Sequence, residues 1–206
     1  MKRFFILAIL LLNTITIAYA NDRGIFWKLK APNGLTHYLF GTIHTDENRI
    51  ITFLPIVKQS LDASDLLVVE IASDDHAKNL FMSNHSLTSD LNEAELNQIK
   101  KLSEFHVMYF ENVIRMKPWL LAIIFDSPKP SSEFNQDFLL MSMASDLDKD
   151  ITGIESSQEH FAIMDSLSLD DQLVMLRSVL KKTEKERLAD YRLLMKEYLL
   201  ADLDRI

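Results

Sequence analysis

The chain has 206 residues, of which 48% are hydrophobic and 25% are charged, so it can bury one substantial core and is not of the intrinsically disordered class. Its 22 basic and 30 acidic residues give a net charge of −8, and an acidic surface repels nucleic acid and anionic lipid. Because the chain has no cysteine, disulfides and thiolate-bound zinc are excluded, and any metal must bind to histidine and carboxylate side chains.

The first twenty residues have the pattern of a secretory signal peptide. Lys2 and Arg3 precede an apolar stretch over residues 4–12, and Ala-Tyr-Ala at residues 18–20 provides the small residues that a signal peptidase accepts. The apolar stretch is shorter than the ~20 residues needed to span a bilayer, which favours a cleaved signal over a membrane anchor. We therefore expect cleavage before Asn21, export to the periplasm or the medium, and no stable membrane insertion afterwards.

The mature chain, residues 21–206, is expected to be a single domain that begins with a β-hairpin. Residues 25–30 and 36–43 are rich in bulky residues that favour strands. Between them, Asn33 and Gly34 provide the positive φ angles that a tight turn requires. The two segments are therefore predicted to form antiparallel strands.

A β-α-β unit is expected next. Pro55 is a good first residue for a helix, and the apolar run at residues 66–71 follows that helix as a further strand. The crossover should be right-handed, with residues 38–43 and 66–71 as parallel strands.

The rest of the chain is predicted to be mostly helical. A polar loop is expected over residues 72–90, and the proline-rich segment 127–132 is a clear break that would suit a hinge. Asn92, with Glu95 three residues on, has the pattern of a helix start. Helices are expected over residues 92–106, 118–125, 135–148, 156–165 and 169–203 (the last as one helix or two), with a strand over residues 151–154. The predicted fold class is α/β: a small, mostly parallel sheet with an N-terminal hairpin, flanked by helices, and a helical C-terminal part.

Three residues with useful chemistry stand directly after apolar, strand-like runs. They are His44, Glu70 and Glu155. In open α/β sheets ligands bind beyond the carboxyl ends of the strands, so these side chains are expected to share one site. A neutral imidazole and two carboxylates can hold a divalent ion that lowers the pKa of bound water toward ~7. One carboxylate would act as a ligand and the other as general base, and the sequence does not decide which.

Each candidate also has a structural interpretation. His44 could cap a turn, Glu70 could pair with a lysine or cap the following helix, and Glu155 could interact with a helix dipole next to Ser156. Alternation along the strand places His37 on the face opposite His44, at the surface. Besides His37, four histidines fit no known metal motif and are expected to be structural or exposed: His76, His85, His106 and His160.

Several short motifs resemble one known family. They are Gly-x-x-His at Gly41–His44, the segment at residues 54–70, Lys-Pro-Trp at residues 117–119, and Gly-Ile-Glu at residues 153–155 with Gln158. In this order they are similar to the TraB/PrgY/GumN family, which includes the Tiki-type metalloproteases. The resemblance implies a metal-dependent hydrolase that acts on peptide bonds of a peptide or protein substrate. It implies a divalent ion (Mn, Co or Zn) and His44, Glu70 and Glu155 as ligands and catalytic residues.

The sequence departs from the family pattern in three places. Relatives have a further buried strand and a second Gly-x-x-His after a segment like residues 198–203, and in this sequence no other Gly-x-x-His occurs after Gly41. Ala201 stands where relatives have glycine, and residues 134–137 stand where relatives tend to have Gly-Leu-Asp. The alternative is therefore a non-catalytic relative that binds peptides or proteins. A missing strand would leave a sheet edge unpaired, which would favour self-association.

Overall fold

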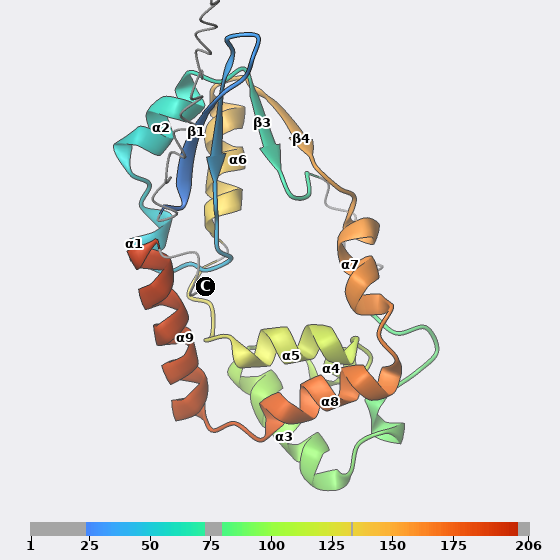
Figure 1. The fold of residues 1–206 in the computed structure, drawn as a ribbon. Coiled ribbons are helices and arrows are strands. Elements are labelled where there is room, and N and C mark those ends of the chain that lie inside the picture. The colour runs from blue at the N-terminus through green and yellow to red at the C-terminus, as the bar shows by residue number, and fades with distance from the viewer. Residues whose placement is uncertain (1–23, 73–79, 133, 202–206) are drawn as a thin grey trace, which may run out of the picture.

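The structure is a computed structural model that describes residues 24–72, 80–132 and 134–201, so the expected signal peptide lies outside the described residues. It combines small sheets with many helices, and the C-terminal part is helical (Figure 1). The fold class expected from the sequence is confirmed. Within these ranges, no helix has both the length and the hydropathy that a membrane span requires.

The N-terminal hairpin forms as predicted. Strands β1 (Phe26–Lys30) and β2 (Thr36–Phe40) are antiparallel, with Phe26 opposite Phe40, and Gly34 has a φ of +86° in the turn. Strand β2 ends earlier than the expected residue 43. The N–H of Gly41 still donates to the carbonyl of Ile25 at 2.7 Å, but the chain then leaves the hairpin. His44 therefore lies in a loop beyond the strand end.

The prediction that β2 and the next strand belong to one sheet as a β-α-β unit is wrong. Strand β3 (Leu66–Val69) pairs with β4 (Asp150–Gly153) in parallel register, and β2 pairs with β1, which gives two separate two-stranded sheets among the described residues. Sequence neighbours pair in most sheets, but here a partner far along the chain replaces the neighbour. Helix α2 (Pro55–Asp62) therefore connects strands of different sheets.

The two sheets nevertheless share one core. They lie side by side in the upper part of the molecule, with helix α6 (Gln136–Asp146) behind them (Figure 1). Side chains from both sheets pack against α2 and α6: Phe26 and Phe40 from the hairpin, Leu67 and Ile151 from the parallel pair, Val57 and Leu61 from α2, and Leu140 and Ala144 from α6.

The largest hydrophobic cluster is helical and lies in the lower part of Figure 1. It joins α3 (Glu93–Phe105), α4 (Phe110–Val113), α5 (Pro118–Asp126), α8 (Leu169–Leu180) and a 3₁₀ turn at Leu87–Ser89. Its fully buried members include Leu87, Ile99, Leu121, Phe125 and Leu176. Helix α3 begins with the predicted capping box, in which the Asn92 side chain accepts from the N–H of Glu95. Most of helix α5 is buried, as its nearly all-apolar sequence indicates, but Ile123 is exposed.

Helix α9 (Glu184–Leu200) supports the loop that carries His44. The expected helix at residues 169–203 is divided into α8 and α9, because Thr183 starts a new helix with a capping box to Glu186. Met195 and Tyr198 of α9 pack against Ile50 in α1 (Asn48–Ile51) and against partly buried residues on either side of the hairpin. Helix α7 (Ser157–Asp165) follows β4 and leads toward α8.

Candidate functional site

A buried glutamine fixes the loop around His44. The side chain of Gln136, 2% exposed, accepts from the N–H of Ile43 at 3.0 Å and donates to the carbonyl of Ile50 at 2.9 Å. The Tyr198 hydroxyl lies 2.9 Å from the same amide oxygen and 2.8 Å from the carbonyl oxygen of Gly41. Burial raises the pKa of Tyr198, so its hydroxyl remains a donor. Buried hydrogen bonds of this kind are costly to break, so the backbone on both sides of His44 is held firmly.

His44 is placed between two carboxylates. Its Nε2 atom lies 3.6 Å from a carboxylate oxygen of Glu70, and its Nδ1 atom lies 3.6 Å from Oδ2 of Asp137. The side-chain amide nitrogen of Asn135 is 3.4 Å from Nδ1. The His44 and Glu70 side chains are 65% and 57% exposed, whereas Asp137 is only 17% exposed. The sequence therefore correctly placed His44 and Glu70 together.

Asp137 is a site residue that the sequence reasoning missed. It lies in the first turn of α6, where Asn135 is the N-cap and accepts from the N–H of Phe138. The hydroxyl of Thr42 donates to Asp137 Oδ1 at 2.8 Å, while the buried Oδ2 atom, which faces His44, has no hydrogen-bond partner among the described residues. An acidic residue near the start of the expected helix 135–148 was the available signal. A buried carboxylate oxygen without a partner is unusual and marks a position where a ligand or proton is expected.

Glu155 lies beside Glu70 but its side chain pairs with His160. The N–H of Glu155 donates to the carbonyl of Glu70 at 3.1 Å, which continues the contact between β3 and β4. The Glu155 carboxylate is 2.7 Å from Nδ1 of His160. Ser156 is the N-cap of α7, so Glu155 directly precedes the cap and His160 is the fourth residue of the helix. Side chains at these two positions commonly contact each other. The expectation that His160 has only a structural or surface role overlooked this contact.

Gly153 allows this close approach of the two strand ends. A Cβ atom at Gly153 would lie 2.9 Å from the backbone nitrogen of Ala72, 3.1 Å from the carbonyl oxygen of Glu155 and 3.4 Å from that of Glu70. These neighbours are backbone atoms, which cannot move aside as a flexible side chain can. The glycine of the Gly-Ile-Glu segment is therefore required for the position of both glutamates.

We expect Gly153→Ala to lower the free energy of unfolding by about 1–3 kcal/mol, because the added methyl group forces the strand ends apart. Urea denaturation monitored by circular dichroism measures this change. Gly41→Ala is the matched control: a Cβ there would meet only Ile25, at 3.8 Å or more, and its expected effect is within about 0.5 kcal/mol. Equal destabilisation by both variants would contradict the proposed role of Gly153.

The donor set around His44 fits a divalent ion in chemistry and in spacing. Two ligands about 2.0–2.2 Å from a tetrahedral ion are separated by roughly 3.3–3.6 Å. The 3.6 Å between His44 Nε2 and Glu70 agrees with this separation. No group of three His, Cys, Asp or Glu side chains within the described ranges is already arranged to hold an ion. A third ligand would therefore require a change of rotamer, which the exposed Glu70 and His44 side chains can make.

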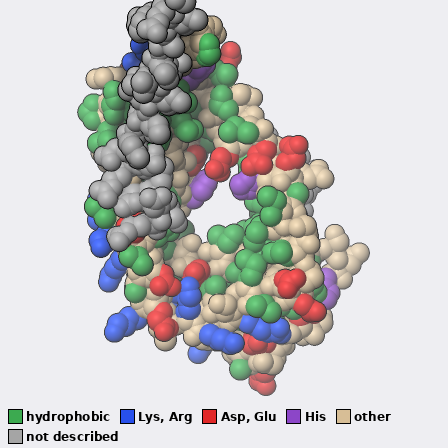
Figure 2. Space-filling model, viewed as in Figure 1, with side chains coloured by type: hydrophobic (Ala, Val, Ile, Leu, Met, Phe, Trp, Pro, Cys, Tyr) green, Lys and Arg blue, Asp and Glu red, His purple; other side chains and the backbone are tan. Residues whose placement is uncertain are grey.

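The ends of the strands border an opening in the molecule. Figure 2 shows this opening in the centre of the view, with histidine and acidic side chains along its upper edge and hydrophobic side chains on its lower and right-hand sides. The upper edge lies below the ends of the strands in Figure 1. The strand ends therefore present polar groups to a space that a ligand can enter.

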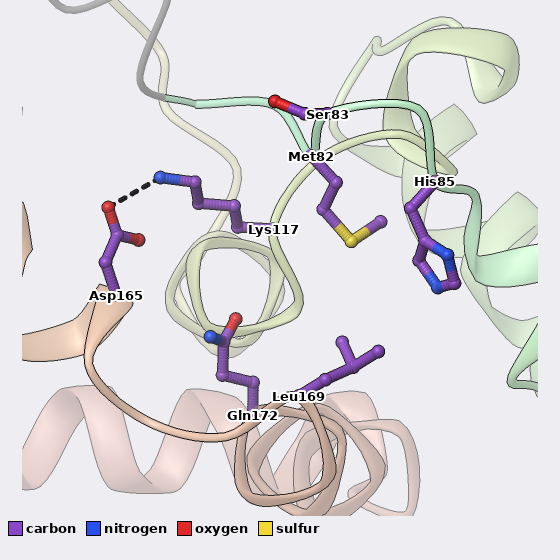
Figure 3. A pocket seen from close by; sticks show the side chains of 7 residues that line it. All are labelled: Met82, Ser83, His85, Lys117, Asp165, Leu169 and Gln172. Carbon is purple, nitrogen blue, oxygen red and sulfur yellow. Dashed lines mark hydrogen bonds and ion pairs between the residues drawn. The ribbon is translucent and has the colours of Figure 1, made fainter.

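A hollow of about 400 Å³ surrounds Lys117 and Asp165 (Figure 3). The Lys117 ammonium group is 2.6 Å from Oδ2 of Asp165, and the indole N–H of Trp119 donates to Oδ1 of the same carboxylate at 3.0 Å. His85, also in the lining, is 2.7 Å from Asp90. The Lys-Pro-Trp segment thus joins the start of α5 to the end of α7, and the Lys117–Asp165 ion pair stabilises this packing.

The motifs noted in the sequence are those of a known family. The sequence profile of the TraB/PrgY/gumN family matches residues 25–206. The chain belongs to this family, as its motifs predicted. Neither a curated protein nor a solved structure gives a significant match to the chain.

Proposed function

We propose that this protein is an exported, metal-dependent hydrolase that acts on peptide bonds. The observation that supports the proposal is the position of His44, with Glu70 at one ring nitrogen and Asp137 at the other. Export rests on the signal-peptide pattern of residues 1–20. The proposal is also supported by the family assignment, because the motifs that resemble the family contain His44, Glu70 and Glu155.

The residues have distinct roles in this proposal. His44, through Nε2, and Glu70 would hold a divalent ion such as Mn, Co or Zn. Asp137 orients the imidazole through Nδ1, as carboxylates commonly do for metal-binding histidines. Thr42 in turn holds Asp137 through the hydrogen bond to Oδ1. Glu155 is available to the same site because its backbone is bonded to that of Glu70.

A bound divalent ion supplies a Lewis acid that polarises a carbonyl group and lowers the pKa of water. Glu155 acts as the general base: it takes the proton of the attacking water and passes it to the nitrogen of the leaving amine. His160, 2.7 Å from the Glu155 carboxylate, holds this group in position. His44, Glu70 and Glu155 thus remain the metal and catalytic residues expected from the sequence, with Glu155 assigned to proton transfer.

Metal content and peptide cleavage test this function together. The mature chain is loaded with Mn, Co or Zn at neutral pH, desalted, and analysed for bound metal, and cleavage of a mixed peptide library is followed by mass spectrometry. We expect one bound ion per chain and cleavage that a chelator abolishes and added metal restores. A chain that retains no metal and cleaves no peptide would contradict the proposal.

A non-catalytic binding protein is the second candidate, and the strand edges favour it. Among the described residues, β2 pairs only with β1 and β3 only with β4, so each sheet has edges without a β partner. Such edges can accept a strand from a peptide or from a second copy of the chain. Sedimentation analysis distinguishes the candidates: a stable monomer with metal-dependent cleavage would exclude this second function.

A further inference from the structure

An apolar cleft opens directly beside His44. It has a volume of about 360 Å³, in the range of sites that bind small molecules or single side chains. His44 and Asn135 are among the residues that line it, so the cleft adjoins the candidate catalytic residues. Its apolar wall is formed by Met108, Ile123, Ile124, Pro128, Pro130 and Phe134. Ile123 and Phe134 are 51% and 48% exposed, which leaves much apolar surface uncovered.

One wall of the cleft is fixed by Asp46. Its carboxylate accepts hydrogen bonds from the Ser131 hydroxyl and the Ser132 N–H, both at 2.6 Å, and from the Ser131 N–H. Residues 131–132 are therefore held to the His44 loop by hydrogen bonds to Oδ2 of Asp46.

The charges of the cleft disfavour an anionic occupant. Of the described residues that line it, none is lysine or arginine, and Asp46 carries a negative charge. His106 is neutral at neutral pH, because burial, together with the nearby charges of Arg187 and Lys129, lowers its pKa. An acidic side chain would thus lose its hydration and find no lysine or arginine among the lining residues, whereas an apolar side chain would lose no favourable hydration.

We propose that this cleft binds a bulky, uncharged apolar side chain of an extended peptide, next to the peptide bond that lies at His44. The inference rests on the proposed function, whose substrate it specifies. Leucine, methionine and phenylalanine fit its size and chemistry, and glutamate and aspartate do not. Selectivity arises from the side chains of Ile123 and Phe134, which have no role in metal binding or proton transfer.

Peptide binding tests the proposal without requiring cleavage. Short capped peptides of one length differ at a single position, which is phenylalanine, leucine, glycine or glutamate, and their dissociation constants are measured on the mature chain with a chelator present. We expect the phenylalanine and leucine peptides to bind about ten- to a hundredfold more tightly than the glutamate peptide. Equal affinities, or no binding, would overturn the inference.

A matched pair of variants locates the binding surface. Ile123→Asp places a charge in the cleft and should weaken binding of the phenylalanine peptide about tenfold or more. Val174→Asp makes the same kind of change on α8, where Val174 is 64% exposed and outside the cleft, and should leave affinity unchanged. Thermal melts confirm that both variants fold. Equal effects of the two variants would overturn the inference.

The outcomes separate this inference from the proposed function. Selective binding by a chain that retains no metal and cleaves nothing would support the cleft and contradict the hydrolase. Metal-dependent cleavage without preference for apolar side chains would support the hydrolase and overturn the cleft assignment. If binding disappears as the chain dimerises, with Ile123 protected in the dimer, a second copy fills the cleft and the assignment is overturned.

Discussion

His44→Ala is expected to weaken binding of a divalent ion by at least about a hundredfold and to abolish metal-dependent cleavage. Loss of a residue that only orients a metal ligand already costs about ten- to a hundredfold in affinity, so loss of the ligand itself should cost no less. His44 is exposed and its loop is held by Gln136 and Tyr198, so the variant should fold normally. Isothermal titration with Mn or Zn measures the change in affinity.

His37→Ala is the control for this experiment. His37 lies on β2 opposite Leu29 and is exposed, on the same hairpin but outside the candidate site. Its removal should leave metal affinity and cleavage unchanged. If the two variants lose affinity equally, metal binding is a general property of surface histidines and the assignment of His44 is wrong.

Phe125→Ala is expected to lower the free energy of unfolding by about 3–5 kcal/mol, the usual cost of deleting a fully buried aromatic ring. Phe125 is 0% exposed in the helical cluster, and its ring centroid lies 5.7 Å from that of His106. For a chain of this size the melting temperature should fall by about 6–20 °C. Urea denaturation and thermal melts measure the two quantities.

Phe138→Ala provides the comparison for Phe125→Ala. Phe138 is 45% exposed on α6 and contacts the ring of Phe134, so its removal should cost no more than about 1 kcal/mol. A similar loss for both variants would mean that the helical cluster around Phe125 is not the main core.

The helices were predictable because their start signals are local. Asn92 with Glu95 forms the expected capping box, and Pro55 and Pro118 occupy first turns, where proline needs no hydrogen-bond donor. Strand pairing was not predictable in the same way. The partner of β3 is β4, far along the chain, and no local pattern in Leu66–Val69 specifies that choice.

The site was predictable in part for the same reason. His44 and Glu70 follow apolar runs, and the ends of those runs meet, although in separate sheets. Asp137 and His160 both lie on helices. Tertiary packing brings Asp137 to His44, and the start of α7 brings His160 to Glu155. The Glu155 carboxylate interacts with His160 at 2.7 Å, because His160 is only five residues away and no long-range contact is needed.

Anomalous diffraction from crystals grown with Zn²⁺ tests the central claim most directly, because it locates the ion. We predict a peak about 2.0–2.2 Å from an imidazole nitrogen of His44 and from a carboxylate oxygen of Glu70. The peak should disappear in crystals of His44→Ala and persist in crystals of His37→Ala. A peak only at other residues, or no peak in the His44 and Glu70 site at saturating zinc, would contradict the account.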